Sequence, residues 1–152
     1  MNDEAKKVLG RLQNLCAKQE CCSADMLQKA LKALEFNRPA AEEVVAALVK
    51  DGYVDDARYA AAFAREKASI TGWGPIKIKF ALAGKGIKGA AVEEALKEID
   101  PGRADAKLRK LLENKWKTLR EDPQGKLKLI KFALSRGYEY EAIKPEIEEI
   151  CS

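Results

Sequence analysis

The sequence contains no histidine, so it lacks the side chain that most often performs acid–base catalysis near neutral pH. It also has no glycine loop joining a strand to a helix, no nucleophile elbow and no spaced cluster of metal ligands. Three of its four cysteines, Cys16, Cys21 and Cys22, are close together, and Cys151 is next to last. Adjacent cysteines give poor zinc geometry, so zinc binding and redox chemistry are the minor alternatives to simple thiols in a reducing compartment. We predict no catalytic residue, no metal site and no cofactor.

Long apolar runs are absent, and none of the apolar stretches approaches the length that crosses a bilayer. The first residues, Met-Asn-Asp-Glu-Ala-Lys-Lys, do not have the basic-then-apolar pattern of a signal peptide. Apolar residues make up 47% of the chain and charged residues 34%, a balance typical of folded proteins rather than disordered ones. We therefore expect a cytoplasmic protein that does not contact the membrane.

Alternating β-branched runs are nearly absent, whereas apolar residues recur at helical spacing along the whole chain. Three apolar stripes predict three helices before residue 51: Leu9, Leu12, Leu15 and Cys16; Met26, Leu27, Ala30, Leu31 and Leu34; Val44, Val45, Leu48 and Val49. Proline and glycine positions then predict helices at 54–69, 75–84, 89–99, 103–119, 124–136 and 140–150. The sequence thus predicts nine helices in three groups of three.

An internal repeat supports this grouping. The tetrapeptide Lys79-Phe80-Ala81-Leu82 recurs 52 residues later as Lys131-Phe132-Ala133-Leu134, and Gly86-Ile87 recurs 51 residues later as Gly137-Tyr138. A period near 50 residues indicates stacked helical units, each too small to bury its apolar faces alone. We predict an all-α fold of three tandem three-helix repeats, at 1–52, 53–101 and 102–152, forming an elongated, curved molecule.

The segment "DGYVDDARYA" at 51–60 contains two adjacent carboxylates, Asp55 and Asp56. Neighbours on a helix point about 100° apart, so these carboxylates cannot converge on one bond or one metal. We predict instead that Asp55 caps the helix that follows and that Asp56 stabilises its positive end, with Tyr53 and Val54 packing against that helix as a staple. Contact with a partner by Asp56, Arg58 or Tyr59 is the alternative. For the second helix, we expect Ser23 and Asp25 to act as caps.

Positive charge is concentrated in the middle and later parts of the chain. Residues 73–90 contain four lysines and no acid, and residues 103–136 contain eleven Lys or Arg against four Asp or Glu. Such zones could face an acidic protein or a phosphate backbone, although a solvated helix face is the simpler alternative. The candidate partner-binding residues are Lys77, Lys79, Lys85, Lys88, Lys126, Lys128, Lys131 and Arg136. Within the same region, Trp73 is expected to be a packing residue between units, with an exposed anchor for a protein or nucleic-acid partner as the alternative.

Three stretches together resemble the RecX family of bacterial regulatory proteins. They are Gly52-Tyr53-Val54-Asp55-Asp56-Ala57-Arg58-Tyr59-Ala60, then Trp73-Gly74-Pro75-Ile76-Lys77-Ile78 leading to Leu82 and Lys85-Gly86-Ile87, and Lys131-Phe132-Ala133-Leu134-Ser135-Arg136-Gly137-Tyr138. The resemblance implies a non-enzymatic protein, expected to be a monomer, that binds the RecA recombinase filament on single-stranded DNA. It also implies inhibition of filament growth, ATP hydrolysis and strand exchange, with possible direct binding to single- or double-stranded DNA.

Two other functions are compatible with the same residues. Three short helices per unit can resemble helix-turn-helix, so a DNA-binding module or transcription regulator acting without RecA is the main alternative. Against it, no helix has the run of Arg, Asn and Gln side chains suited to reading base edges. A passive helical scaffold is the third possibility and predicts binding to neither DNA nor RecA.

Overall fold

A computed structural model describes all residues, 1–152, and contains nine α-helices, one π-helical turn and no strand. The elements are α1 (Asp3–Lys18), α2 (Ser23–Ala33), α3 (Arg38–Lys50), α4 (Asp56–Glu66), η1 (Lys67–Thr71), α5 (Pro75–Gly84), α6 (Ala90–Leu96), α7 (Pro101–Leu119), α8 (Gly125–Ser135) and α9 (Tyr140–Cys151). The prediction of an all-α fold with nine helices is confirmed.

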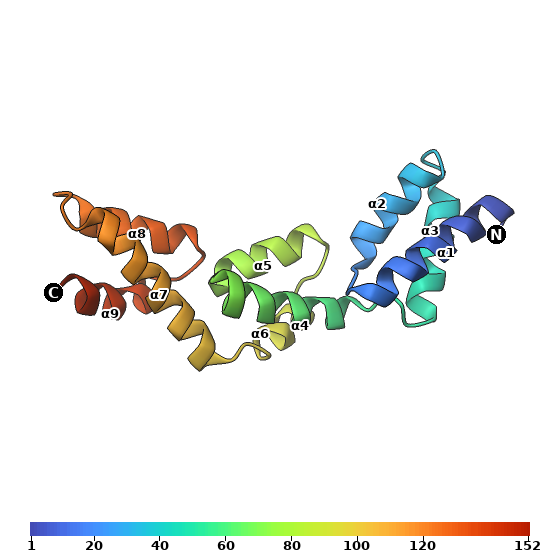
Figure 1. Cartoon of the computed structure of the whole chain (residues 1–152). Coiled ribbons are helices and arrows are strands. Elements are labelled where there is room, and N and C mark those ends of the chain that lie inside the picture. Colours follow the sequence, from blue (N-terminus) through green and yellow to red (C-terminus); the bar gives the residue numbers. More distant parts are fainter.

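The helices form three groups arranged along a shallow arc, with the two termini at opposite ends (Figure 1). Helices α1–α3, α4–α6 and α7–α9 each enclose most of one apolar cluster. The second helix of each group, α2, α5 or α8, lies along the upper edge in Figure 1. The predicted repeats and elongated, curved shape are therefore present, whereas the exact unit boundaries at residues 53 and 102 stay predictions.

The segment between α3 and α4 differs from the expected staple. Val54 is 2% exposed and belongs to the apolar cluster of α1–α3, and Tyr53 packs against the same cluster. Tyr59 and Phe63 instead pack in the cluster of α4–α6, where their rings stack at a centroid distance of 5.8 Å. The prediction that Tyr53 and Val54 pack against the α4 face is wrong, because the backbone amides of both residues bond to Leu48 O and hold them against the end of α3.

The start of α2 also differs from expectation. Its N-cap residue is Cys22, which makes no side-chain cap, and Ser23 already has helical geometry. The cap is supplied by Asp56 of α4, whose carboxylate accepts from the Ser23 amide at 2.8 Å and from the Ser23 hydroxyl. Neither Ser23 nor Asp25 therefore caps α2. Instead, α2 is capped by the Asp56 carboxylate, which lies 33 residues later in the chain.

The repeat register is given by the 51-residue shift rather than the 52-residue shift. Ile78 and Leu82 are fully buried on α5, and the residues 51 positions later, Leu129 and Ala133, are fully buried on α8. The tetrapeptide match is one residue out of this register, which on a helix rotates a side chain by about 100°. Accordingly, Phe80 is 81% exposed, whereas Phe132 packs against the third cluster.

Helix α4 is shorter than the predicted 54–69 and continues as the π-helical turn η1, which ends at Gly72 with a positive φ of 80°. A side chain at Gly72 would overlap Leu111 of α7. This close approach lets α7 pack on η1 and joins the second and third groups. Trp73 follows η1 and packs in the second cluster, with its ring edge-on to Phe63 at 6.0 Å. Its predicted packing role is confirmed, but the packing lies within the second group rather than between units.

Candidate functional site

Helices α5 and α8 contain lysine but no aspartate or glutamate. They follow one another along the same edge of the arc, with the C-terminal end of α8 next to the N-terminal end of α5 (Figure 1). The contact between them is fixed by backbone hydrogen bonds from Gly74 N to Arg136 O, at 2.7 Å, and from Ile76 N to Gly137 O, at 3.0 Å. Two acid-free helices thus form one continuous surface.

Five of the eight candidate residues form no ion pair, and three of these five are also exposed. Lys88, Lys126 and Lys131 are exposed and form no ion pair with another residue of the chain. Lys88 lies in the turn after α5, and the other two lie on α8. A partner could reach these ammonium groups without first breaking an internal contact.

Two further candidates form exposed ion pairs. Lys79 Nζ lies 3.5 Å from Glu93 Oε1, and Lys128 is paired with Asp122. The hydrogen bond from Lys128 lowers the pKa of the Asp122 carboxyl below its ordinary value. Exposed pairs of this kind contribute little to stability, typically about 0 to 1 kcal/mol, so a partner carboxylate or phosphate can compete for these lysines.

Lys77 and Lys85 make contacts that link them to their surroundings. The Lys77 ammonium lies 4.6 Å from the centroid of the Trp73 ring, on which Lys67 also lies at 4.9 Å. Lys85 donates to Asp25 of α2 at 2.7 Å, and this hydrogen bond raises the pKa of the lysine. Lys85 therefore connects the first and second groups, and its charge is shared with Asp25.

Arg136 lies in the junction between the second and third groups. Its guanidinium donates from Nη2 to Thr71 O and lies over the Phe132 ring at 5.9 Å, while its Nε is buried without a partner. Its own carbonyl accepts from Gly74 N. These contacts make Arg136 a structural residue of the junction, in contrast to the exposed lysines of α8.

The same junction depends on two glycines and a tyrosine. A side chain at Gly74 would overlap the carbonyl of Gly137, and a side chain at Gly137 would overlap Lys77. Gly137 also has a positive φ of 94°. The Tyr138 hydroxyl donates to Gly72 O at 3.2 Å, and burial raises the pKa of this phenol. Backbone contact and steric fit therefore fix α8 relative to α5.

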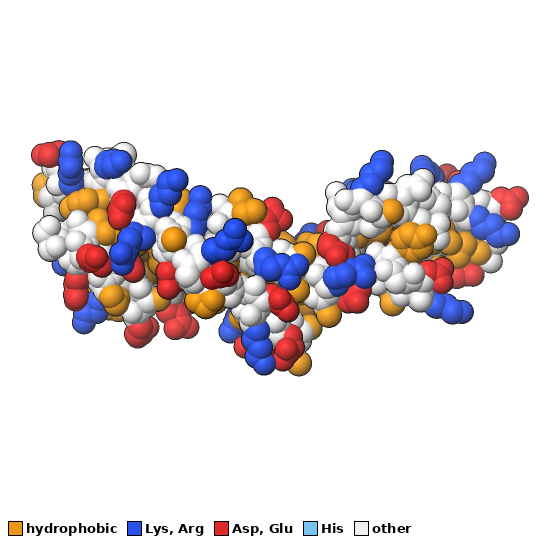
Figure 2. Space-filling view, turned by 60° about the horizontal axis from the view of Figure 1, so that its bottom comes forward, with side chains coloured by type: hydrophobic (Ala, Val, Ile, Leu, Met, Phe, Trp, Pro, Cys, Tyr) orange, Lys and Arg blue, Asp and Glu red, His pale blue; other side chains and the backbone are white.

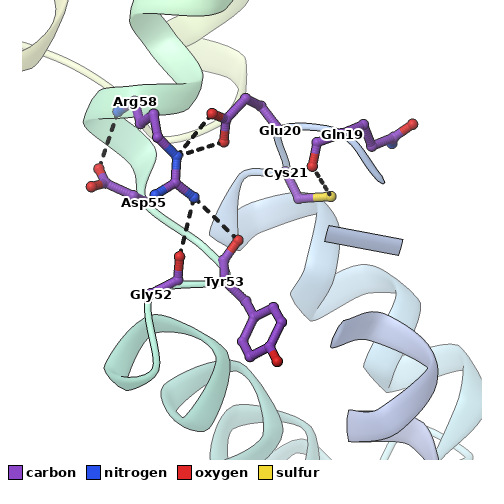
Figure 3. Close-up of polar contacts among 7 residues, drawn as sticks. All are labelled: Gln19, Glu20, Cys21, Gly52, Tyr53, Asp55 and Arg58. Carbon is purple, nitrogen blue, oxygen red and sulfur yellow. Dashed lines mark hydrogen bonds and ion pairs between the residues drawn. The ribbon is translucent and has the colours of Figure 1, made fainter. Parts of the chain in front are cut away.

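The first and second groups are joined mainly by side chains. Arg58 of α4 donates from Nε to both carboxylate oxygens of Glu20 at 2.8 Å and from Nη2 to the carbonyls of Gly52 and Tyr53 (Figure 3). Its interaction with Glu20 raises the pKa of the guanidinium. In the same view, Asp55 accepts from the Arg58 amide at 3.1 Å, as predicted for the cap of α4. Asp55 thus caps its own helix, whereas Asp56 caps α2.

The basic zone does not extend as one patch over α7. Arg109 donates to Glu146 at 2.9 Å and to Glu149 at 3.1 Å on α9, so part of the acidic C-terminal segment neutralises α7. Figure 2 shows the lower face of the molecule turned forward, where acidic and basic side chains are interspersed. Among the α-helices, only α5 and α8 therefore contain basic residues and no acidic ones.

Sequence reasoning did not identify exposed apolar residues on this surface. Phe80 is 81% exposed, and Ile76, Leu127 and Leu134 are between 45% and 49% exposed. The available signal was that α5 has apolar side chains on all its faces, a pattern expected of a fully buried helix. Only one of those faces is covered.

No grouping of three or more potential metal-ligating side chains occurs in the chain. None of its helices combines the length and the apolar character needed to span a bilayer.

Residues 55–96 match the second three-helix domain of RecX, and residues 104–145 match the third. A "Regulatory protein RecX" of Clostridium acetobutylicum is 31% identical over 128 residues, which are 80% of this chain and 59% of that protein. One from Bacillus cereus (strain B4264) is 30% identical over 122 residues, which are 79% of this chain and 45% of that protein. The chain thus spans about half the length of these curated relatives.

Two solved structures share the fold. The crystal structure of a regulatory protein RecX matches with a TM-score of 0.80 at 22% identity, covering 93% of this chain and 70% of that one. The crystal structure of RecX from Lactobacillus salivarius matches with a TM-score of 0.77 at 22% identity, covering 99% and 98%. The two matched domains correspond to α4–α6 and to most of α7–α9, in chain order. The chain belongs to the RecX family.

Proposed function

We propose that this RecX-family protein binds RecA, or the RecA filament on single-stranded DNA, and inhibits filament growth, ATP hydrolysis and strand exchange. It acts as a cytoplasmic, monomeric regulator without catalysis of its own. The observation that carries the proposal is the acid-free surface of α5 and α8 along one edge of an elongated arc. A filament offers acidic protein surface and DNA phosphates to such a row of lysines.

The shape suggests how inhibition occurs. An arc of three small helical groups is long relative to its width (Figure 1), so one molecule could contact neighbouring subunits of a helical filament. A molecule bound in this way blocks addition of the next subunit or favours release of a bound one. No covalent step is needed, and direct contact with DNA adds to binding.

We assign the partner contacts to the eight basic residues, with different weights. Lys88, Lys126 and Lys131 contribute most because their charges are unpaired, and Lys79 and Lys128 contribute through exposed pairs that exchange easily. Lys77, Lys85 and Arg136 act mainly by holding this surface in place.

The direct test measures ATP hydrolysis by RecA on single-stranded DNA with this protein at ratios well below one per RecA. Inhibition at such ratios supports filament binding, and an unchanged rate even with excess protein rejects the proposed function. Reversal of three charges, Lys79, Lys126 and Lys131 to Glu, should weaken inhibition by about tenfold or more with unchanged helicity. The matched control reverses Lys6, Lys7 and Lys18, which are exposed on α1 and away from this surface.

A DNA-binding protein acting without RecA would use the same lysines and is distinguished by salt. Simple phosphate binding falls steeply between about 50 and 200 mM salt because counterions are released. Capture of a RecA filament should persist better over this range. Binding to DNA alone, lost at physiological salt with no effect on RecA, would favour the alternative.

A further inference from the structure

Helix α5 has two opposite apolar faces. Ile78 and Leu82 are fully buried, whereas Ile76 is 49% and Phe80 81% exposed. At about 100° per residue, Ile76 and Phe80 lie four apart on the face directly opposite the buried pair. The outward face of α5 is therefore apolar although nothing in the chain covers it.

A similar face continues on α8. In the 51-residue register, Leu127 corresponds to Ile76 and Leu134 to Ala83, and both leucines are nearly half exposed. Because Ile76 N bonds to Gly137 O, three residues after Leu134, the N-terminal end of α5 lies beside the C-terminal end of α8. We call Ile76, Phe80, Leu127 and Leu134 the apolar ridge. Single exposed apolar residues are common, but four on the outward faces of two helices that meet end to end indicate an interaction surface.

The charges beside the apolar ridge indicate its partner. Every charged side chain on α5 and α8 is a lysine. Lys79 is next to Phe80 in sequence, Lys126 is next to Leu127, and Lys131 lies one helical turn after Leu127. A partner of complementary chemistry presents apolar side chains bordered by carboxylates. A second copy of the chain is disfavoured because two lysine-rich, acid-free surfaces would face each other in a two-fold contact.

Nucleic acid fits the apolar ridge less well. Stacking of unpaired bases requires aromatic rings, and three of the four ridge residues are aliphatic. The nearby Trp73 ring is occupied by Lys67 and Lys77. Phosphates can contact the lysines, but they gain nothing from isoleucine and leucine.

We propose that the apolar ridge docks onto an acidic protein surface, with Phe80 as the central anchor and the neighbouring lysines setting orientation. The proposal rests on the proposed function in that the RecA filament is the partner used to test it. Large exposed side chains that become buried in a partner carry much of the affinity of an interface. Phe80 contributes little to folding because it is exposed, so its removal separates binding from stability.

The test compares Ile76→Ala/Phe80→Ala with Ile70→Ala as a matched control. Ile70 is 68% exposed on η1 and lies outside the apolar ridge. Alanine favours helix, so α5 should stay folded, as judged by circular dichroism and the urea midpoint. We expect the double variant to require about tenfold more protein for half-inhibition of RecA ATP hydrolysis, while Ile70→Ala matches wild type.

The outcomes separate the two proposals. If the wild-type protein does not inhibit RecA, the proposed function is overturned, and so is the proposal that the apolar ridge docks onto the RecA filament. If wild type inhibits and the double variant is equally potent, the apolar ridge is rejected while the proposed function stands. Loss of single-stranded DNA binding by the double variant, measured by fluorescence anisotropy without RecA, would assign the ridge to nucleic acid instead. A concentration-dependent wild-type dimer that the variant abolishes, seen by sedimentation, would assign it to a second copy.

Discussion

Two adjacent carboxylates, Asp55 and Asp56, have different targets, and replacing each with alanine should have separable effects. Asp55 accepts from the Arg58 amide within its own helix, whereas Asp56 accepts from the amide and hydroxyl of Ser23 on α2. The two residues are neighbours in sequence and equal in charge. They therefore provide a matched pair of carboxylates that accept hydrogen bonds from different helices.

The magnitudes follow from the hydrogen bonds. Loss of a helix cap typically costs about 1 kcal/mol, which corresponds to about fivefold faster exchange of the capped amide. Asp56 accepts two hydrogen bonds as a half-buried carboxylate, so its loss should cost about 1.5 kcal/mol or more and speed exchange at Ser23 by about tenfold. Asp56→Ala should leave the Arg58 amide protected, and Asp55→Ala should leave the Ser23 amide protected.

Amide hydrogen exchange followed by NMR measures both sites in one sample of each variant. A pattern in which each variant deprotects only its own target supports two independent caps. If Ser23 exchanges at the wild-type rate in Asp56→Ala, the carboxylate does not cap α2, and the link between the first and second groups must depend on other contacts. Deprotection of both amides in either variant would mean that the two caps are not independent.

Three other predictions test separate features. Gly137→Ala should destabilise the protein by about 2 kcal/mol or more, because a Cβ there would overlap Lys77 and the residue has a positive φ. The control Gly10→Ala, in open space on α1, should stabilise the protein by about 0.5 kcal/mol. Urea midpoints that shift in the same direction for both variants would contradict this prediction. Burial raises the pKa of the partly buried Cys16 to about 12 and that of the buried Cys22 above its ordinary value. Mass spectrometry should therefore find both thiols largely unmodified by iodoacetamide at pH 8, and rapid modification of either would contradict its raised pKa. The lowered pKa of Asp122 contributes stability that is present above about pH 4 and lost on further acidification. The stability of Asp122→Asn should therefore decline less steeply with falling pH than that of wild type, as followed by circular dichroism. Equal declines in the two proteins would count against the pair with Lys128.

Local sequence rules predicted the helices well because their signals are local. Pro39, Pro75 and Gly52 lie where helices begin or end, and apolar spacing identified most of the core. The cap of α2 could not be predicted in the same way, because Asp56 reaches Ser23 only after α4 has packed beside α2. The repeat register was similarly ambiguous, since a matching tetrapeptide carried more sequence identity than the buried positions one residue away.

The composition of the candidate site was predictable, but its contacts were not. The lack of acidic residues near Lys79 and Lys131 is visible in the sequence, and both side chains are exposed in the structure, on α5 and α8 respectively. The partners of Lys85 and Arg136 are distant in sequence, at Asp25 and Thr71, so their structural roles depend on how the groups stack. The exposure of Phe80 was hidden because an apolar residue in an apolar helix is normally buried.

The two junctions differ in the kind of contact that holds them. Between the second and third groups, backbone hydrogen bonds and close contacts at glycines hold the helices together. Between the first and second groups, the polar links are mainly side chains, Arg58 to Glu20 and Lys85 to Asp25, which salt screens. The helices α5 and α8 lie on either side of the junction that these backbone hydrogen bonds hold, so their lysines and the apolar ridge are fixed relative to one another there. A surface that must recognise a repeating partner benefits from that rigidity, because contacts fixed in advance lose less entropy on binding.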